Sequence, residues 1–229
     1  MNDSSTPALQ AEALSMHFSS PQGTIRLLAS LELSIAAGES VAILGTSGSG
    51  KSTLLGLLAG LDLPTSGRVS LAGYDMTAMG EDERAQLRAG RVGFVFQAFH
   101  LLPGLTALEN VMLPGELAGS DGVRAAATQA LERVGLGARA GHYPAQLSGG
   151  EQQRAAMARA IVSQPSVLFA DEPTGNLDHA TGGYVIDQLF EMNRIDGMTL
   201  VLVTHDPTLA ARCQRVLQLE DGVLVASAP

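Results

Sequence analysis

Short apolar runs separated by turn residues make up most of the hydrophobic pattern of this 229-residue chain. LELSI (31–35) alternates like a half-buried strand, whereas SVAIL (40–44) is continuously apolar, as a strand buried on both faces would be. We also expect strands at 67–73, 91–96, 166–170 and 199–203. A helical stretch separates the last two, and this alternation predicts an α/β fold with a parallel sheet.

The middle and the end of the chain follow other patterns. Residues from about 106 to 162 are predicted to be rich in helix, with capping-box sequences TALE at 106–109 and SGGE at 148–151. Gly135 suits the position after a helix end, and Asp221-Gly222 between two apolar runs predicts a type I′ hairpin. We therefore expect a single domain with three parts: a tail at 1–8, a core made of 9–97 and 161–229, and a helical subdomain at 98–160.

The segment GTSGSGKS follows a predicted buried strand and opens a predicted helix. Its glycines allow successive backbone N–H groups to face one anion, and the helix N-terminus adds partial positive charge. Lys51 would supply a point charge to the β- and γ-phosphates, and the Ser52 hydroxyl would bind Mg²⁺. The predicted nucleotide-binding residues here are Gly45, Thr46, Ser47, Gly48, Ser49, Gly50, Lys51, Ser52 and Thr53.

Two adjacent acids, Asp171 and Glu172, end the apolar run VLFA. An apolar strand that ends in Asp is typical of the second half of a P-loop NTPase site, where the carboxylate binds Mg²⁺. Glu172 would then lie beside the γ-phosphate as a general base for water. The alternative is a solvated acidic turn before Pro173, which the phosphate loop upstream disfavours.

A second predicted helix start lies in LSGGEQQR (147–154). Ser148 would cap the helix, and Gly149 and Gly150 would expose backbone N–H groups to an anion. Because the phosphate loop already serves one anion, a chain with both features could build a composite site with a second copy of itself. The alternative is an ordinary capped helix.

These strings resemble the ATP-binding cassette (ABC) family, with GTSGSGKS as Walker A, LSGGE as signature and VLFADE as Walker B. The resemblance covers about residues 9 to 225 and implies a P-loop NTPase (RecA-like) core, an antiparallel β subdomain and a helical signature-motif subdomain. It also implies a role for each of four residues: Gln97 as Mg²⁺ ligand and γ-phosphate sensor, Asp178 in the D-loop, His205 as switch histidine, and Phe18 stacking on adenine. Phe18 stands where Tyr is commoner, and His17 is an alternative for its role.

Longer strings such as LFADEPTGNLD are similar to the subgroup that includes lipoprotein-release (LolD) and macrolide-export (MacB) ATPases, and the C-terminal part resembles the YbbA type. The resemblance implies an ATPase that binds ATP and Mg²⁺, forms a homodimer in the ATP-bound state, and powers an integral-membrane permease. We expect a four-span permease with a large extracytoplasmic domain, and export or lipoprotein extraction. An ATP-driven mechanotransmission complex without cargo stays an alternative, and the cargo is not encoded.

The apolar segment FHLLPGL (99–105) follows Gln97 and contains Pro and Gly, so it is not a long helix. We expect it to form an exposed apolar groove for a helix of the permease, and a buried loop is the alternative. The resemblance favours the groove.

Composition and motifs together exclude several other classes of protein and of partner. The net charge of −9 disfavours a nucleic-acid partner, and the single Cys213 cannot form an intrachain disulfide. LSGGEQQR argues against a P-loop kinase, and one cassette without a heptad insert argues against an ABC protein of DNA repair or translation. No apolar stretch is long enough to span a membrane and no signal-peptide pattern is present, so we expect a cytoplasmic protein held at the inner face of the cell membrane by its permease.

Overall fold

The computed structural model describes residues 6–20, 23–46 and 48–226. The chain divides into two compact units, one made of residues 1–88 and 199–229 and the other of residues 89–198. The predicted helical subdomain, 98–160, falls within the second unit, and its boundaries stay a prediction. Of the predicted tail, residues 1–5 lie outside the described residues.

The first unit contains an antiparallel sheet with the strand order β2-β1-β4-β5. Leu9 pairs with Ile35 on one side and with Leu71 on the other, and all three side chains are fully buried. This row of aliphatic side chains across neighbouring strands stabilises the sheet. The bounds are β1 (Leu9–Ser20), β2 (Gly23–Ile35), β4 (Ser66–Leu71) and β5 (Tyr74–Asp75).

Strand β2 is longer than the strand expected at 31–35, and β1 was not predicted at all. The first four residues of β2 are exposed, so its N-terminal half carries no hydrophobic alternation. In β1, register shifts after Ala11, Leu14 and Met16 interrupt the pairing with β2. Such bulges break the period of two on which strand prediction depends.

A second set of strands in the same unit has the order β10-β9-β3-β8. Strand β3 runs parallel to both β8 and β9, whereas β9 and β10 are antiparallel. Every residue of β8 and the first four residues of β3 are buried, so the continuous apolar runs are two-sided strands, as predicted. The bounds are β3 (Ser40–Leu44), β8 (Thr199–Thr204), β9 (Arg215–Glu220) and β10 (Val223–Ala226).

The predicted hairpin joins β9 to β10. Asp221 and Gly222 have φ angles of 47° and 79°, and a type I′ turn requires positive φ at both positions, so this prediction is confirmed.

The helices of this unit are α1 (Lys51–Leu58), α2 (Glu81–Arg88), α7 (Pro207–Ala210) and the 3₁₀ helix η1 (Met76–Ala78). Cys213 is buried beside α7, and its burial raises the pKa of the thiol to about 12, so it stays protonated.

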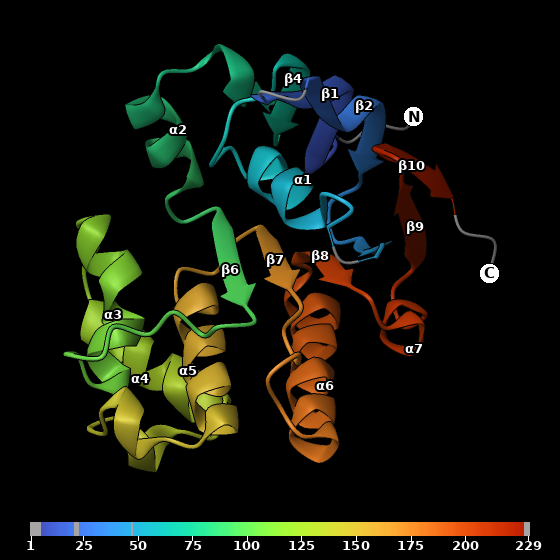
Figure 1. Cartoon of the computed structure of the whole chain (residues 1–229). Coiled ribbons are helices and arrows are strands. Elements are labelled where there is room, and N and C mark those ends of the chain that lie inside the picture. Colours follow the sequence, from blue (N-terminus) through green and yellow to red (C-terminus); the bar gives the residue numbers. More distant parts are fainter. Residues whose placement is uncertain (1–5, 21–22, 47, 227–229) are drawn as a thin grey trace, which may run out of the picture. The chain divides into compact units, whose positions relative to one another are not determined.

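The second unit pairs two parallel strands with four α-helices. Phe94 on β6 stacks on Phe169 on β7, which anchors the strand pair in an apolar core. Helices α3, α4 and α5 lie side by side (Figure 1). The bounds are β6 (Val92–Phe96), α3 (Ala107–Leu117), α4 (Val123–Arg133), η2 (Gly137–Arg139), η3 (Pro144–Gln146), α5 (Gly149–Ile161), β7 (Val167–Asp171) and α6 (His179–Asp196).

Both predicted capping boxes are present. The Thr106 side chain accepts a hydrogen bond from Glu109 N at the start of α3, and Ser148 does the same with Glu151 at the start of α5. Gly135, with φ 73°, follows the end of α4 as predicted. Over the described part of the chain, no helix is both long and apolar enough to cross a membrane.

Candidate functional site

The loop between β3 and α1 has the conformation that its glycines allow. Gly48 and Gly50 have φ angles of 80° and 95°, which side chains other than glycine rarely adopt. Gly50 stands at the N-cap of α1 and makes no side-chain cap, so no side chain competes with an anion for the helix start. Ser47 was predicted to bind nucleotide and lies outside the described residues.

Lys51 is the only lysine in the chain and is almost fully buried. Its Nζ donates to the carbonyl oxygens of Gly45 (2.8 Å) and Thr46 (2.9 Å), so the ammonium group faces the inside of the loop. A Cβ on Gly45 would lie 2.6 Å from Ser49 Oγ and 3.1 Å from Leu219 O, so a side chain there would displace the Ser49 hydroxyl. Ser49 Oγ itself is buried and has no hydrogen-bond partner among the described residues. An ammonium group and an unpaired hydroxyl inside one glycine loop suit an anion.

His205 lies at the same sheet edge as this loop. Leu44 and Thr204 pair in register at the carboxyl ends of the parallel strands β3 and β8. Gly45 and His205 follow them directly, so the tertiary structure brings the loop and the predicted switch histidine to one edge. In the first turn of α1, Ser52 is exposed and Thr53 is half-buried.

The two adenine candidates lie on β1. Phe18 is 46% exposed, and His17 is exposed as well, so burial does not choose between them. Phe18 pairs with Ile25 on β2, which is also exposed.

In the second unit, two further predicted site residues, Gln97 and Glu172, also lie at the carboxyl ends of neighbouring parallel strands. Phe96 and Asp171 pair in register at the carboxyl ends of β6 and β7, so Gln97 and Glu172 follow neighbouring strands. Glu172 has φ 46°, a left-handed conformation that costs a non-glycine residue about 1 kcal/mol. This conformation turns the chain sharply after the strand, and Gly175 N closes the turn on Glu172 O at 3.0 Å. Backbone strain thus falls on the residue predicted to be the general base.

Gln97 makes a reciprocal pair with Asn176, which precedes the predicted D-loop aspartate. Gln97 Nε2 donates to Asn176 Oδ1 (3.2 Å), and Asn176 Nδ2 donates to Gln97 O (2.9 Å). A Cβ on Gly175 would lie 2.7 Å from Gln97 Nε2, so a side chain there would displace the Gln97 amide from this pair. The sequence points to Gln97 but not to its link with Asn176, because 79 positions lie between the two.

The signature residues and Asp178 form two helix starts in contact. Hydrogen bonds from the backbone and hydroxyl of Ser148 hold the pKa of the Glu151 carboxyl below its ordinary value. Asp178 Oδ1 caps α6 by accepting from Ala180 N (3.1 Å) and Thr181 N (3.0 Å). A Cβ on Gly150 would lie 2.3 Å from Thr181 Cγ2, so the start of α5 packs on the first turn of α6. Ser148 and Gly149 are exposed, whereas Gly150 is buried.

The segment 99–105 is held by two side chains that sequence reasoning missed, the buried Asn110 and the half-buried Arg159. Asn110 is fully buried; its Oδ1 accepts from Leu102 N (2.7 Å), and its Nδ2 donates to the carbonyls of Leu102 (3.1 Å) and Leu105 (3.0 Å). Arg159 donates to the carbonyls of Phe99 and His100. Leu102 is 49% exposed although its backbone is held by Asn110, so the segment is not a buried loop.

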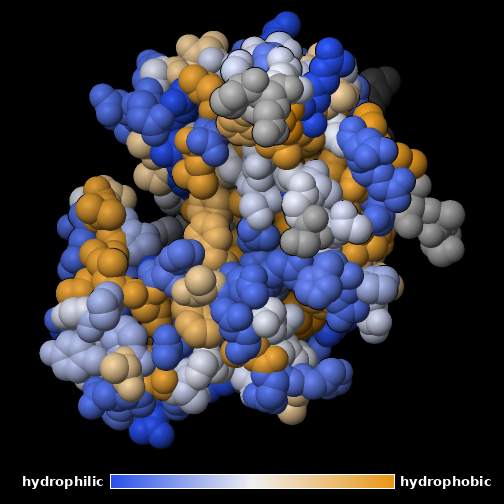
Figure 2. Space-filling model, viewed as in Figure 1, coloured by the Kyte–Doolittle hydropathy of each residue, from blue (hydrophilic) through white to orange (hydrophobic). Residues whose placement is uncertain are grey.

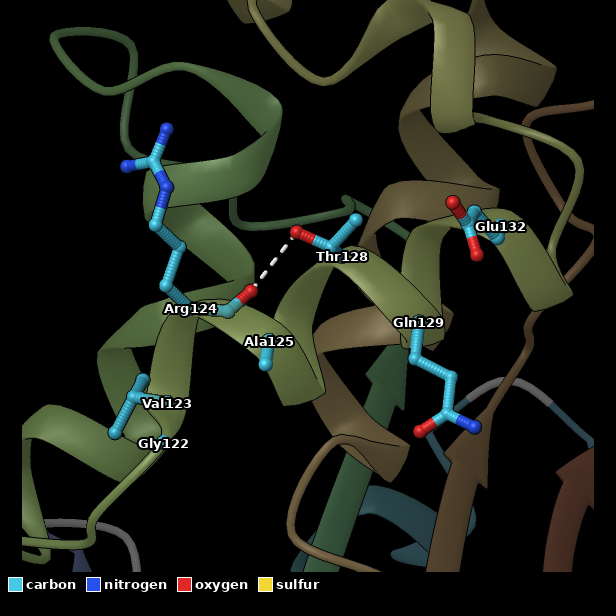
Figure 3. Close-up of a pocket in the computed structure, with 7 residues that line it drawn as sticks. All are labelled: Gly122, Val123, Arg124, Ala125, Thr128, Gln129 and Glu132. Atoms are coloured by element: carbon cyan, nitrogen blue, oxygen red, sulfur yellow. Dashed lines mark hydrogen bonds between the residues drawn. The ribbon is translucent and has the colours of Figure 1, made fainter.

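A shallow depression on α4 is separate from these residues. Figure 3 shows it along one face of the helix, where Thr128 Oγ1 donates to Arg124 O (2.8 Å). Its lining residues are Gly122, Val123, Arg124, Ala125, Thr128, Gln129 and Glu132, and sequence reasoning predicted none of them. In Figure 2, hydrophobic residues also gather along α3, where Leu117 is 85% exposed.

The three predicted metal ligands are oxygen donors: the Ser52 hydroxyl, the Gln97 amide and the Asp171 carboxylate. Ser52 and Gln97 are exposed, and Asp171 is half-buried at the end of β7. Within the described ranges, no group of three or more His, Cys, Asp or Glu side chains could hold a metal ion.

Comparison with known proteins gives concordant matches. The sequence model of the family described as ABC transporter matches residues 28–175. The uncharacterized ABC transporter ATP-binding protein YbbA of Escherichia coli (strain K12) is 56% identical over 87% of this chain and 89% of its own length. The lipoprotein-releasing system ATP-binding protein LolD of Xanthomonas campestris pv. campestris (strain 8004) is 51% identical over 99% of this chain and 96% of its own. The dimeric post-hydrolysis structure of the ATP-binding cassette MJ0796 with ADP and Pi matches with a TM-score of 0.87 and 39% identity, covering 94% of this chain and 96% of that one.

Proposed function

Because the chain belongs to the ABC transporter family, as an ATP-binding subunit that hydrolyses ATP, we propose that two copies enclose two ATP molecules and drive a membrane permease. What supports this proposal is that the chain has two separate glycine-containing helix starts of the kind that can bind an anion, α1 after the phosphate loop and α5 at the signature. Each ATP would lie between the phosphate loop of one copy and the α5 start of the other.

We assign each predicted site residue a role in ATP binding or hydrolysis from the chemistry of its side chain or backbone. Lys51, the loop N–H groups and His205 would hold the γ-phosphate, and Ser148 and Gly150 of the second copy would contact it from the other side. Glu172 would accept a proton from the attacking water. The water oxygen bonds to the γ-phosphorus while the bond to the β–γ bridging oxygen breaks, which releases ADP and phosphate. Phe18 would stack on adenine, and Asp178 would hold the start of α6 at the composite site.

The donor chemistry of Ser52, Gln97 and Asp171 fits Mg²⁺, which prefers oxygen ligands and binds through few protein groups plus phosphate. When bound, Mg²⁺ would neutralise charge on the phosphate oxygens. Gln97 uses its Nε2 for Asn176, so its Oε1 is the atom we assign to the metal. We therefore propose Ser52, Gln97 and Asp171 as the protein ligands of Mg²⁺.

The composite site is tested by dimer formation. Glu172→Gln with ATP and Mg²⁺ should sediment as a dimer, because the unhydrolysed nucleotide keeps the site closed. Adding Ser148→Arg should abolish the dimer, because the bulky side chain occupies the helix start that phosphate needs. The matched control is Thr106→Arg, which removes the equivalent capping residue from α3. A normal dimer with Ser148→Arg would contradict the proposal, whereas loss of the dimer with both substitutions would indicate general destabilisation.

The permease would bind at the segment 99–105, which holds the subunit at the inner face of the membrane. Leu102 is 49% exposed, lies five positions after Gln97 in the chain, and donates a backbone hydrogen bond to the buried Asn110. Since the LolD relatives belong to lipoprotein-releasing systems, we propose an export or lipoprotein-extraction permease of the four-span type.

Leu102→Glu should abolish co-purification with the permease, because an unpaired charge in a dry interface costs about 2–5 kcal/mol. The isolated subunit should keep its basal ATPase activity and its thermal transition, since Leu102 is exposed. Leu117→Glu on α3 is the matched control, because it adds the same charge at an exposed leucine. Pull-down of the permease at the wild-type yield would remove Leu102 from the interface.

A further inference from the structure

Gln153 on α5 is a fully buried polar side chain to which the proposed function assigns no role. Its Nε2 donates to the carbonyl oxygens of Pro173 (2.6 Å) and Phe96 (3.3 Å), which lie 20 and 57 positions away in the chain. One amide group therefore joins three separate segments of the second unit.

Both acceptors are next to residues of the proposed active site. Phe96 ends β6 and precedes Gln97, and Pro173 follows Glu172 in the turn after β7. The donor itself lies on α5, little more than one turn after the signature residues 148–150. The side chain thus ties the start of α5 to the two backbone segments that carry Gln97 and Glu172.

Packing alone does not explain a glutamine at this position. Its Oε1 is buried and accepts no hydrogen bond from any described residue, which is a cost that an apolar side chain of the same size would avoid. The buried residues that follow it on α5, Ala155 to Ala158, are all apolar. The two hydrogen bonds from Gln153 Nε2, to the carbonyl oxygens of Phe96 and Pro173, explain why a polar side chain stands here.

We propose that Gln153 is a positioning residue that couples the two ATP sites of the dimer. This inference rests on the proposed function, in which residues 148–150 contact the nucleotide of the other copy while Gln97 and Glu172 act on the chain's own nucleotide. A shift of α5 on binding that distant phosphate would reach the Phe96 and Pro173 carbonyls through Nε2. Because water is excluded there, no solvent hydrogen bond can replace the link.

The test is Gln153→Met, which keeps an unbranched, helix-forming side chain of similar volume and removes the donor. We expect ATP affinity of the monomer to stay unchanged and kcat to fall about 10- to 100-fold, because the segments that carry Gln97 and Glu172 lose a contact that positions them. The Hill coefficient for ATP should fall from a wild-type value above 1 to about 1. The matched control is Gln188→Met on α6, because Gln188 also has a buried, unpaired Oε1 but donates only to Tyr184 OH on its own helix. The Gln188→Met control should keep the wild-type kcat and the wild-type Hill coefficient.

The outcomes separate the inference from the proposed function. If Gln153→Met keeps wild-type cooperativity, the coupling role is wrong and the dimer model stands. If the wild-type protein itself neither dimerises with ATP nor shows cooperativity, the proposed function fails and the inference fails with it. Should Gln153→Met not fold, Gln153→Leu is judged by the same criteria, because it also removes the Nε2 donor and places no charge in the buried site. Loss of the thermal transition in both variants would make Gln153 a core residue and overturn the proposal.

Discussion

Glu172→Gln is expected to lower ATP turnover by roughly 10²–10⁴ and to leave ATP binding intact, since this is the usual contribution of a general base. Glutamine has the same length and volume as glutamate but cannot take a proton from water. Glu172 follows Asp171 at the carboxyl end of β7, and its left-handed backbone conformation directs the chain into the turn closed by Gly175 N. The substitution changes the chemistry of the side chain and keeps this backbone.

Single-turnover phosphate release and binding of a fluorescent ATP analogue measure the two halves of this prediction. Glu191→Gln is the matched control, because Glu191 is an exposed acid on α6 and loses the same charge. Contaminating ATPases must be excluded before the turnover of Glu172→Gln is compared with wild type. Turnover close to wild type would then show that Glu172 is not the general base.

Lys51→Ala should weaken ATP binding about 10- to 100-fold, because a hydrogen bond to a charged group is worth about 1.5–3 kcal/mol. In the structure, Lys51 Nζ is bonded to the carbonyls of Gly45 and Thr46, and a phosphate would take over those bonds. Lys51→Arg should not restore full affinity, since a larger, planar guanidinium would replace a compact ammonium group that is almost fully buried.

The composition of the chain offers a direct measurement of this contact. Because Lys51 is the only lysine, protein labelled with ¹³C-lysine gives a single lysine Cε signal in NMR spectra. ATP should shift this signal, and Lys51→Ala identifies it by its absence. An unchanged signal at saturating ATP would show that the ammonium group does not contact the nucleotide.

The sequence by itself determined the family, the buried strands and the positions of the helix starts. The strands at 40–44 and 199–204 are visible as continuous apolar runs because both of their faces are buried. The two capping boxes and the Asp221-Gly222 turn are also local, since a cap or a two-residue turn depends on residues close together in the chain. ATP binding and hydrolysis followed from the order of such local motifs, and the family comparison confirms them.

Only the tertiary structure decided which residues lie together around these motifs. The strand at 9–20 escaped prediction because its bulges break the alternation of buried and exposed positions. Asn110 and Gln153 read as ordinary polar helix residues in the sequence, and their importance comes from burial against carbonyl groups of other segments. Gln97 and Asn176 meet across 79 positions for the same reason. A hydrogen bond between distant segments exists only once strands and helices have packed, so no periodicity or spacing along the chain reveals it.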